Sequence, residues 1–99
     1  VWADLLADRS VEAVAESFES YPGVDLPSSP EQLIEVFEEP DRPQPRMDRM
    51  LGDGMAVSAG GIESTTHGVQ YNCLAHNTMR GAAGASVLNG ELLLEEGFL

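Results

Sequence analysis

The residues best suited to chemistry in this chain lie between His76 and Leu94. A polar pair, His76-Asn77, follows an apolar segment, and the helix predicted next opens with glycine and alanine and closes with leucine. Small residues allow a backbone or a ligand to approach closely, and the free N–H groups of a helix N-terminus can bind an anion or an amide. We therefore expect the start of this helix either to face a site or to pack closely against another element, and its leucines to enter a core.

The histidines and the single cysteine do not form a metal-binding pattern. His67, Cys73 and His76 lack the CxxC and HExxH spacings of zinc sites. We expect no metal, with His67 in a turn and His76 capping a strand end or forming local hydrogen bonds. One cysteine cannot form an intramolecular disulfide, and the apolar neighbours of Cys73 predict a small buried side chain rather than a nucleophile.

Two serines and a glycine-rich run also lack the surroundings of known motifs. Ser58 and Ser86 do not lie in the GxSxG sequence of a hydrolase nucleophile elbow. The run from Gly81 to Gly84 lacks both the GxGxxG pattern of dinucleotide binding and the lysine of the P-loop. Spacing alone therefore assigns no catalytic residue.

An amphipathic helix and a pair of strands are expected to support the helix start. Ser10 suits a helix N-cap, and Pro22-Gly23 would end the helix. The residues that share its apolar face at helical spacing are Val11, Val14, Ala15 and Phe18. Residues 55–62 and 69–75 predict two strands joined by a turn over 65–68, and residues 1–8 could finish a further strand.

The middle of the chain permits more than one interpretation. Ser29-Pro30-Glu31-Gln32 could be a capping box for a short helix, whereas the β-branched and aromatic residues over 33–37 favour a strand. Prolines make the segment from Glu38 to Pro45 irregular. Arginines interleave with these prolines from Arg42 to Arg49, and we interpret this stretch as an extended binding arm or interface loop.

The last element is predicted to be a C-terminal helix over residues 78–95. Its pattern repeats at helical spacing, so small residues of the first turns and leucines of the later turns fall on one side. The residues predicted to share this face are Gly81, Gly84, Ala85, Leu88 and Leu92.

Composition excludes several classes of function. Seventeen acidic residues against five arginines give a net charge of −12, which argues against nucleic-acid binding because that binding depends on Lys and Arg. A hydrophobic content of 42% argues against disorder. No apolar run reaches the roughly 18 residues that cross a bilayer, and no signal peptide is visible, so we expect a soluble cytoplasmic protein. A salt-adapted source is a hypothesis that the acidic surface raises.

Three motifs in order along the chain carry a family resemblance. The segments Arg42–Arg49, Gly54–Ser58 and His76–Gly84 resemble aspartate-semialdehyde dehydrogenases of the branch found in archaea and fungi, and the likeness extends from Pro27 to Leu94. It implies an α+β fold. Residues 1–99 would form the C-terminal part of a glyceraldehyde-3-phosphate-dehydrogenase-like catalytic and dimerisation domain, with a mixed or antiparallel sheet and flanking helices.

The resemblance also implies an activity and a cofactor. Such enzymes use NADPH to convert 4-phospho-L-aspartate into the semialdehyde for lysine, threonine and methionine biosynthesis, through a cysteine thioester and a histidine base. Both catalytic positions are expected before Val1, so the isolated chain should be inactive. Asn77 matches an amide near the nicotinamide, Thr78 lies beside it, and Gly81 would allow close approach; the NADP site would be shared with an N-terminal domain.

The resemblance implies partners as well, and it has one departure. We expect a homo-oligomer, a dimer or tetramer, that takes a small-molecule substrate and binds neither nucleic acid nor membrane, with the Arg42–Arg49 arm at the subunit interface. The family usually shows Gly-Arg-Ile-Arg where this chain has Gly60-Gly61-Ile62-Glu63, which puts the pairing of those arginines in doubt. Two alternatives remain open: a related acyl-CoA reductase of the malonyl-CoA type, and a non-catalytic dimerisation domain.

Overall fold

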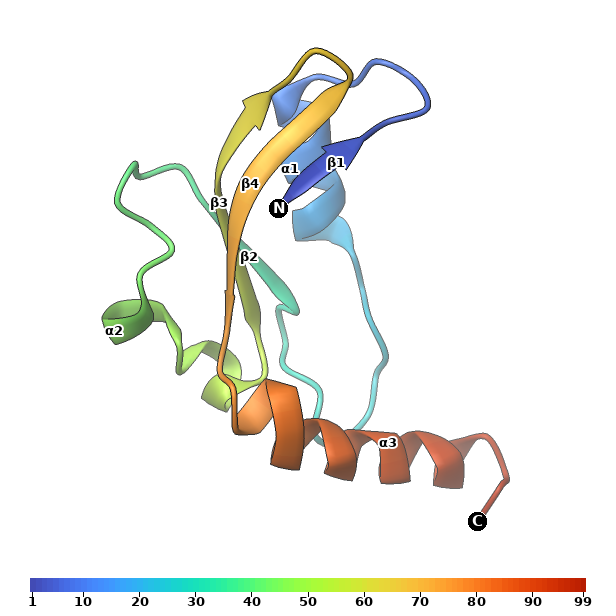
Figure 1. Ribbon diagram of the computed structural model, residues 1–99. Helices are drawn as coiled ribbons and strands as arrows, with labels where there is room; N and C mark the ends of the chain where they lie inside the picture. The colour runs from blue at the N-terminus through green and yellow to red at the C-terminus, as the bar shows by residue number, and fades with distance from the viewer.

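A four-stranded sheet organises the chain in the computed structural model, which describes residues 1–99 (Figure 1). Its strands lie in the order β1-β4-β3-β2, with bounds β1 Trp2–Asp4, β2 Ile34–Phe37, β3 Val57–Ser64 and β4 Gly68–Ala75. β4 pairs antiparallel with both β1 and β3, whereas β2 pairs parallel with β3. The sheet is therefore mixed, and the predicted α+β class is confirmed.

Helix α1 (Val11–Ser20) covers one face of this sheet (Figure 1). Ser10 is its N-cap, as predicted, and the Ser10 hydroxyl accepts a hydrogen bond from the Ala13 N–H at 3.1 Å. The apolar face of α1 packs toward β2 and β3, and the rings of Phe18 and Tyr71 meet edge to face with centroids 5.1 Å apart. Helical spacing in the sequence thus identified both the element and the side of it that packs.

The segment after α1 resolves the alternatives for residues 29–37. Residues 31–33 form a bend rather than a helix, and the strand interpretation is the one found, as β2. Register places Ile34 opposite Val57 and Val36 opposite Ala59. Opposite residues in a sheet point to the same face, so these four side chains form the apolar layer beneath α1.

The Arg42–Arg49 segment is folded rather than extended, which corrects the predicted arm. Pro45–Asp48 forms a short helix, α2, whose N-cap Gln44 accepts from the Met47 N–H at 3.0 Å. The carboxylate of Asp48 is buried and accepts hydrogen bonds from Arg42 Nε at 2.8 Å and the Gln44 N–H at 2.7 Å, together with an ion pair to Arg42 Nη2. The arginine supplies an internal partner, so the prolines do not hold it out toward solvent.

Glycine at position 60 lets this folded segment lie directly on the sheet. A Cβ at Gly60 would lie 2.8 Å from Pro43 Cδ and closer still to the Arg42 carbonyl oxygen. The Arg42 guanidinium carbon in turn lies 4.4 Å from the centroid of the Phe37 ring, an attractive cation–π arrangement. This segment therefore covers the part of the second face of the sheet around Gly60 and Phe37.

A short 3-10 segment, η1 (Leu51–Gly54), leads into β3, and β4 leads into a π-helical turn, η2 (Met79–Ala83), that continues as α3 (Gly84–Glu95). The π turn corrects the predicted helical face. A π turn holds more residues than an α turn, so Gly81 is rotated away and exposed, while Leu88 is buried and Gly84, Ala85 and Leu92 are half-buried. The period of an α-helix therefore placed Gly81 on the wrong face, because Gly81 lies in the π turn.

The core is small, and it does not include the cysteine. The buried apolar residues are Met55, Ala56, Ala59, Val69 and Leu88. Cys73 is exposed, so the prediction of a buried thiol was wrong: α1 packs over β2 and β3 and leaves this part of β4 open. None of the helices is both long and apolar enough to span a bilayer.

Candidate functional site

The predicted site residues lie at the junction where β4 ends and the π turn η2 begins. Asn77 and Thr78 are exposed there. The π-type hydrogen bonds from the Gly81 N–H to the His76 carbonyl at 3.0 Å and from the Ala83 N–H to the Thr78 carbonyl at 2.7 Å close the turn. The π turn therefore brings Gly81 next to Asn77, and Asn77, Thr78 and Gly81 are all exposed.

Gly81 leaves space beside the Asn77 amide. A Cβ at Gly81 would lie 3.5 Å from Asn77 Oδ1 and 3.6 Å from the His76 carbonyl oxygen. Both distances are ordinary van der Waals contacts, so the position lies directly beside the amide without crowding it. The Asn77 side chain can both donate and accept hydrogen bonds, so the surface offers an accessible amide next to an uncovered stretch of backbone.

The His76 ring accepts hydrogen bonds from the first N–H groups of the turn. Its Nδ1 accepts from the Thr78 N–H and from the Met79 N–H, both at 3.2 Å, and lies 3.1 Å from Thr78 Oγ1. The prediction of local hydrogen bonding by His76 is confirmed. These two N–H groups are consequently not free to bind an anion, which corrects the expectation that the helix N-terminus itself would offer them.

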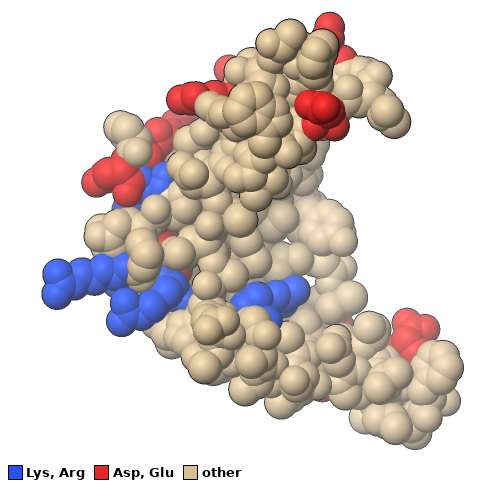
Figure 2. Space-filling model, viewed as in Figure 1, with Lys and Arg blue, Asp and Glu red and all other residues tan.

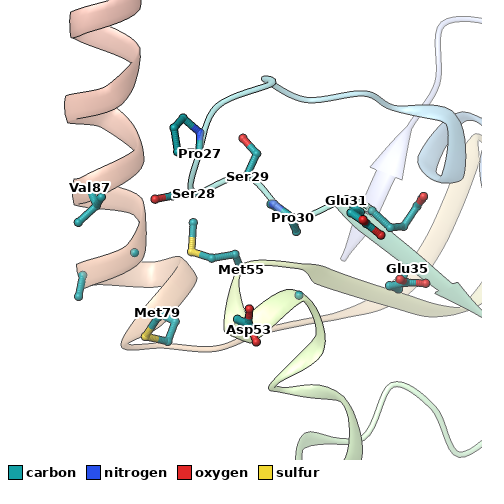
Figure 3. A pocket seen from close by; sticks show the side chains of 14 residues that line it. Pro27, Ser28, Ser29, Pro30, Glu31, Glu35, Asp53, Met55, Met79 and Val87 are labelled. Atoms are coloured by element: carbon teal, nitrogen blue, oxygen red, sulfur yellow. The ribbon is translucent and has the colours of Figure 1, made fainter.

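A cavity of about 670 Å³ lies on another side of the same turn. Figure 3 shows it between the start of α3, the η1 turn and the segment before β2. Its lining includes Glu31, Glu35, Asp53, Met79 and Val87. Asn77, Thr78 and Gly81 do not line it, so the predicted contact surface and the cavity are separate features. Sequence reasoning did not find the cavity, because its three carboxylates come from two segments that are distant in sequence, residues 31–35 and η1.

One hydrogen-bonded contact fixes a wall of this cavity. The Glu91 carboxylate on α3 accepts from the Ser28 N–H at 2.9 Å and from the Ser28 hydroxyl at 2.6 Å. Both hydrogen bonds involve an ionised acceptor, which makes them stronger than neutral ones. They hold the loop before β2 against α3 over a separation of 63 residues in sequence.

The other residues considered from the sequence are spread over the molecule. His67 is exposed in the turn between β3 and β4, as predicted. Ser58 is buried in β3 and its hydroxyl has no partner, while the Ser86 hydroxyl donates to the Ala82 carbonyl at 3.0 Å. No three His, Cys, Asp or Glu side chains lie close enough together to hold a metal ion. Neither Ser58 nor Ser86 is therefore hydrogen-bonded to a base.

Charge is distributed unevenly over the surface. Figure 2 shows basic side chains at one edge and in the lower middle of the molecule, whereas acidic side chains form a few groups near the rim and most of this face is uncharged. Arg46 and Arg49 are exposed on and beside α2. The hydrogen bond with Arg42 lowers the pKa of Asp48 below its ordinary value, and the same bond raises the pKa of Arg42. This pair is the one salt bridge of the chain.

Most of the known proteins with similar sequences carry the same enzyme name. No family model matches the chain. Aspartate-semialdehyde dehydrogenase of Archaeoglobus fulgidus is 52% identical over 97 residues, which are 97% of this chain and 28% of the relative. Malonyl CoA reductase (NADP) of Metallosphaera sedula is 40% identical over 99 residues, covering 93% of this chain and 28% of that protein.

A solved structure agrees with the sequence comparison. The crystal structure of aspartate semialdehyde dehydrogenase with NADP from Candida albicans matches with a TM-score of 0.79 and 37% identity, over 94% of this chain and 27% of that one. The chain thus spans little more than a quarter of the length of the relatives it matches. In sequence and in fold, this chain belongs to the aspartate-semialdehyde dehydrogenase family.

Proposed function

We propose that this chain is part of the C-terminal catalytic and dimerisation domain, residues 1–99, of an NADP-dependent aspartate-semialdehyde dehydrogenase. The reaction would be the reductive dephosphorylation of 4-phospho-L-aspartate to L-aspartate 4-semialdehyde, a cytoplasmic step in the biosynthesis of lysine, threonine and methionine. The observation that carries the proposal is the combined likeness in sequence and fold to a dehydrogenase crystallised with NADP. In this proposal the predicted C-terminal helix over 78–95 corresponds to η2 and α3, Met79–Glu95.

The surface at the start of η2 is proposed to meet the nicotinamide end of the cofactor. Asn77 would hydrogen-bond the carboxamide, Thr78 would lie beside it, and Gly81 would let the cofactor approach the backbone. Their exposure, and the clearance that Gly81 gives to the Asn77 amide, support this role. The remainder of the NADP site would come from an N-terminal domain, and the small-molecule substrate would lie between the two.

Catalysis is proposed to depend on residues outside this chain. Cys73 is exposed and has no hydrogen-bonded base, and neither histidine contacts it. We expect the isolated chain to be inactive, and the longer enzyme to act as a homo-oligomer, a dimer or tetramer. The exposed arginines of the Arg42–Arg49 segment are proposed to take part in the subunit contact.

The test of the cofactor role is Asn77→Ala in the longer enzyme that carries this segment. Loss of the amide hydrogen bonds should raise the KM for NADPH about tenfold, which corresponds to roughly 1.4 kcal/mol. Asn89→Ala is a matched control, because Asn89 is an exposed asparagine farther along α3. An unchanged KM for NADPH together with unchanged turnover in the Asn77 variant would refute the role.

A second function is favoured by one specific similarity. The 40% identity to a malonyl CoA reductase that uses NADP makes reduction of an acyl thioester the alternative. Oxidation of NADPH should be followed with 4-phospho-aspartate and with malonyl-CoA in turn. A higher kcat/KM for malonyl-CoA would select the alternative, and inactivity with both would favour a non-catalytic dimerisation domain.

A further inference from the structure

The ring of His76 is the one side chain that caps the π turn. Neither η2 nor α3 has a capping side chain at the residue preceding it. His76 instead reaches forward from the end of β4, and its Nδ1 lies 3.2 Å from both the Thr78 and the Met79 nitrogen. A backbone N–H can only donate, so Nδ1 must be the acceptor and the ring proton must lie on Nε2.

These hydrogen bonds enclose Asn77. The side chain of His76 bonds the backbone on the far side of Asn77, while the His76 carbonyl accepts from the Gly81 N–H at 3.0 Å. The peptide groups before and after Asn77 are therefore both tied to the same histidine.

The opposite side of the turn is fixed by close packing. A Cβ at Gly54 would lie 2.9 Å from Met79 Cβ, and a Cβ at Gly84 would lie 2.9 Å from the Met79 carbonyl oxygen and closer to Met55 Sδ. Met55 and Gly54 are buried. Met79 is thus held by glycines on one side and by the His76 ring on the other, and π turns of this kind occur frequently at functional sites.

We propose that His76 is a positioning residue, which acts on the cofactor through Asn77 by holding the backbone of the π turn. The proposal rests on the cofactor role proposed above for Asn77. The ring contacts no reacting atom in this role. It replaces the capping side chain that the turn otherwise lacks, and so keeps the Asn77 amide presented over Gly81.

The test compares two amide variants of His76 in the longer enzyme that carries this segment. His76→Asn keeps a side-chain acceptor near the position of Nδ1, whereas His76→Gln moves its acceptor about one bond outward, near the position of Nε2. Loss of a capping side chain typically lowers stability enough to correspond to about a fivefold change. We expect the KM for NADPH to rise about fivefold in the Gln variant and in His76→Ala, and to stay near the parent value in the Asn variant.

Two further measurements separate positioning from a merely structural effect. Hydrogen exchange at the Thr78 and Met79 amides should quicken in the Gln variant and slow again in the Asn variant. Combined with Asn77→Ala, His76→Gln should add no further rise in the KM for NADPH, because the group through which it acts is gone. A full additional rise in the double variant would overturn the proposal, as would equal KM values for the Gln and Asn variants.

The outcomes also distinguish this proposal from the proposed function. If Asn77→Ala raises the KM but His76→Gln does not, the cofactor role holds and the positioning role is wrong. If Asn77→Ala leaves the KM unchanged, the cofactor role fails and the role of His76 fails with it. Because both amide variants retain a polar side chain of similar character, the comparison stands even if His76→Ala does not fold.

Discussion

The Arg42–Arg49 segment and the C-terminal helix α3 differ in how many of their side chains find partners within this chain. In the first, a charged residue is buried with three hydrogen-bond donors around its carboxylate. In the second, apolar side chains are left open: Val87 is 57% exposed, Leu93 45% and Leu94 64%. A helix that is apolar on most sides is usually buried, so α3 carries more apolar surface than this chain covers.

The difference shows which region packs entirely against residues of this chain and which region is left partly uncovered. The segment over the sheet forms its contacts with residues of the same chain, through Phe37, Gly60 and Asp48. The π turn and α3 expose both the proposed cofactor surface and the uncovered leucines. Because the chain spans 28% of the length of its Archaeoglobus relative, we infer that the functional surface lies on the side that the rest of the enzyme would cover.

The largest expected effect comes from Gly60→Ala. The added Cβ would press on Pro43 Cδ at 2.8 Å and, closer still, on the backbone of Arg42, and backbone atoms cannot move aside as a flexible side chain can. We expect the free energy of unfolding to fall by about 3 kcal/mol, measured by urea denaturation of the 99-residue chain. A change below about 0.5 kcal/mol would show that the segment does not pack on the sheet as described.

Asp48→Asn should have the next largest effect. The substitution keeps the shape of the side chain but removes the charge that its buried hydrogen bonds to Arg42 depend on. Hydrogen bonds to charged groups contribute more than neutral ones, so we expect a loss of about 2 kcal/mol in the free energy of unfolding. Asp53→Asn is the matched control, because Asp53 is exposed and has no salt bridge.

The same pair predicts a dependence of stability on pH. The hydrogen bond from Arg42 lowers the pKa of Asp48 in the folded chain below its ordinary value of 3.8. Its stabilisation is therefore fully present above that value and is lost as the pH falls through the lowered pKa. Unfolding curves taken between neutral and acid pH should show the parent chain and Asp48→Asn converging only below pH 3.8. Convergence of the two curves near neutral pH would contradict a lowered pKa of Asp48 in the folded chain.

The smallest effect is expected from Gly90→Ala, in helix α3. A Cβ at Gly90 would meet nothing within 4 Å, and alanine favours a helix over glycine by about 0.8 kcal/mol. The variant should stabilise the 99-residue chain by about that amount. In the longer enzyme the gain should shrink or reverse, because the open side of α3 would be covered. An equal gain in both proteins would argue that α3 stays exposed.

Most of the elements, and part of the candidate site, could be predicted from local patterns. The Ser10 cap, the strands on either side of the 65–68 turn and the hydrogen bonding of His76 follow from neighbouring residues and are confirmed. The exposure of Cys73 could not be predicted, because it depends on which strands α1 covers. The roles of Asn77, Thr78 and Gly81 stay predictions.

By itself, the sequence determined the order and type of most of the elements and the family resemblance, since each depends on residues close together along the chain. The tertiary structure decided three further features: the burial of Asp48 against Arg42, the rotation of Gly81 by a π turn, and the separation of the cavity from the Asn77 surface. Each depends on contacts between segments, such as Gly60 against Arg42 or Gly84 against Met55. Local propensity carries no information about such contacts, because they form only when separate elements pack together.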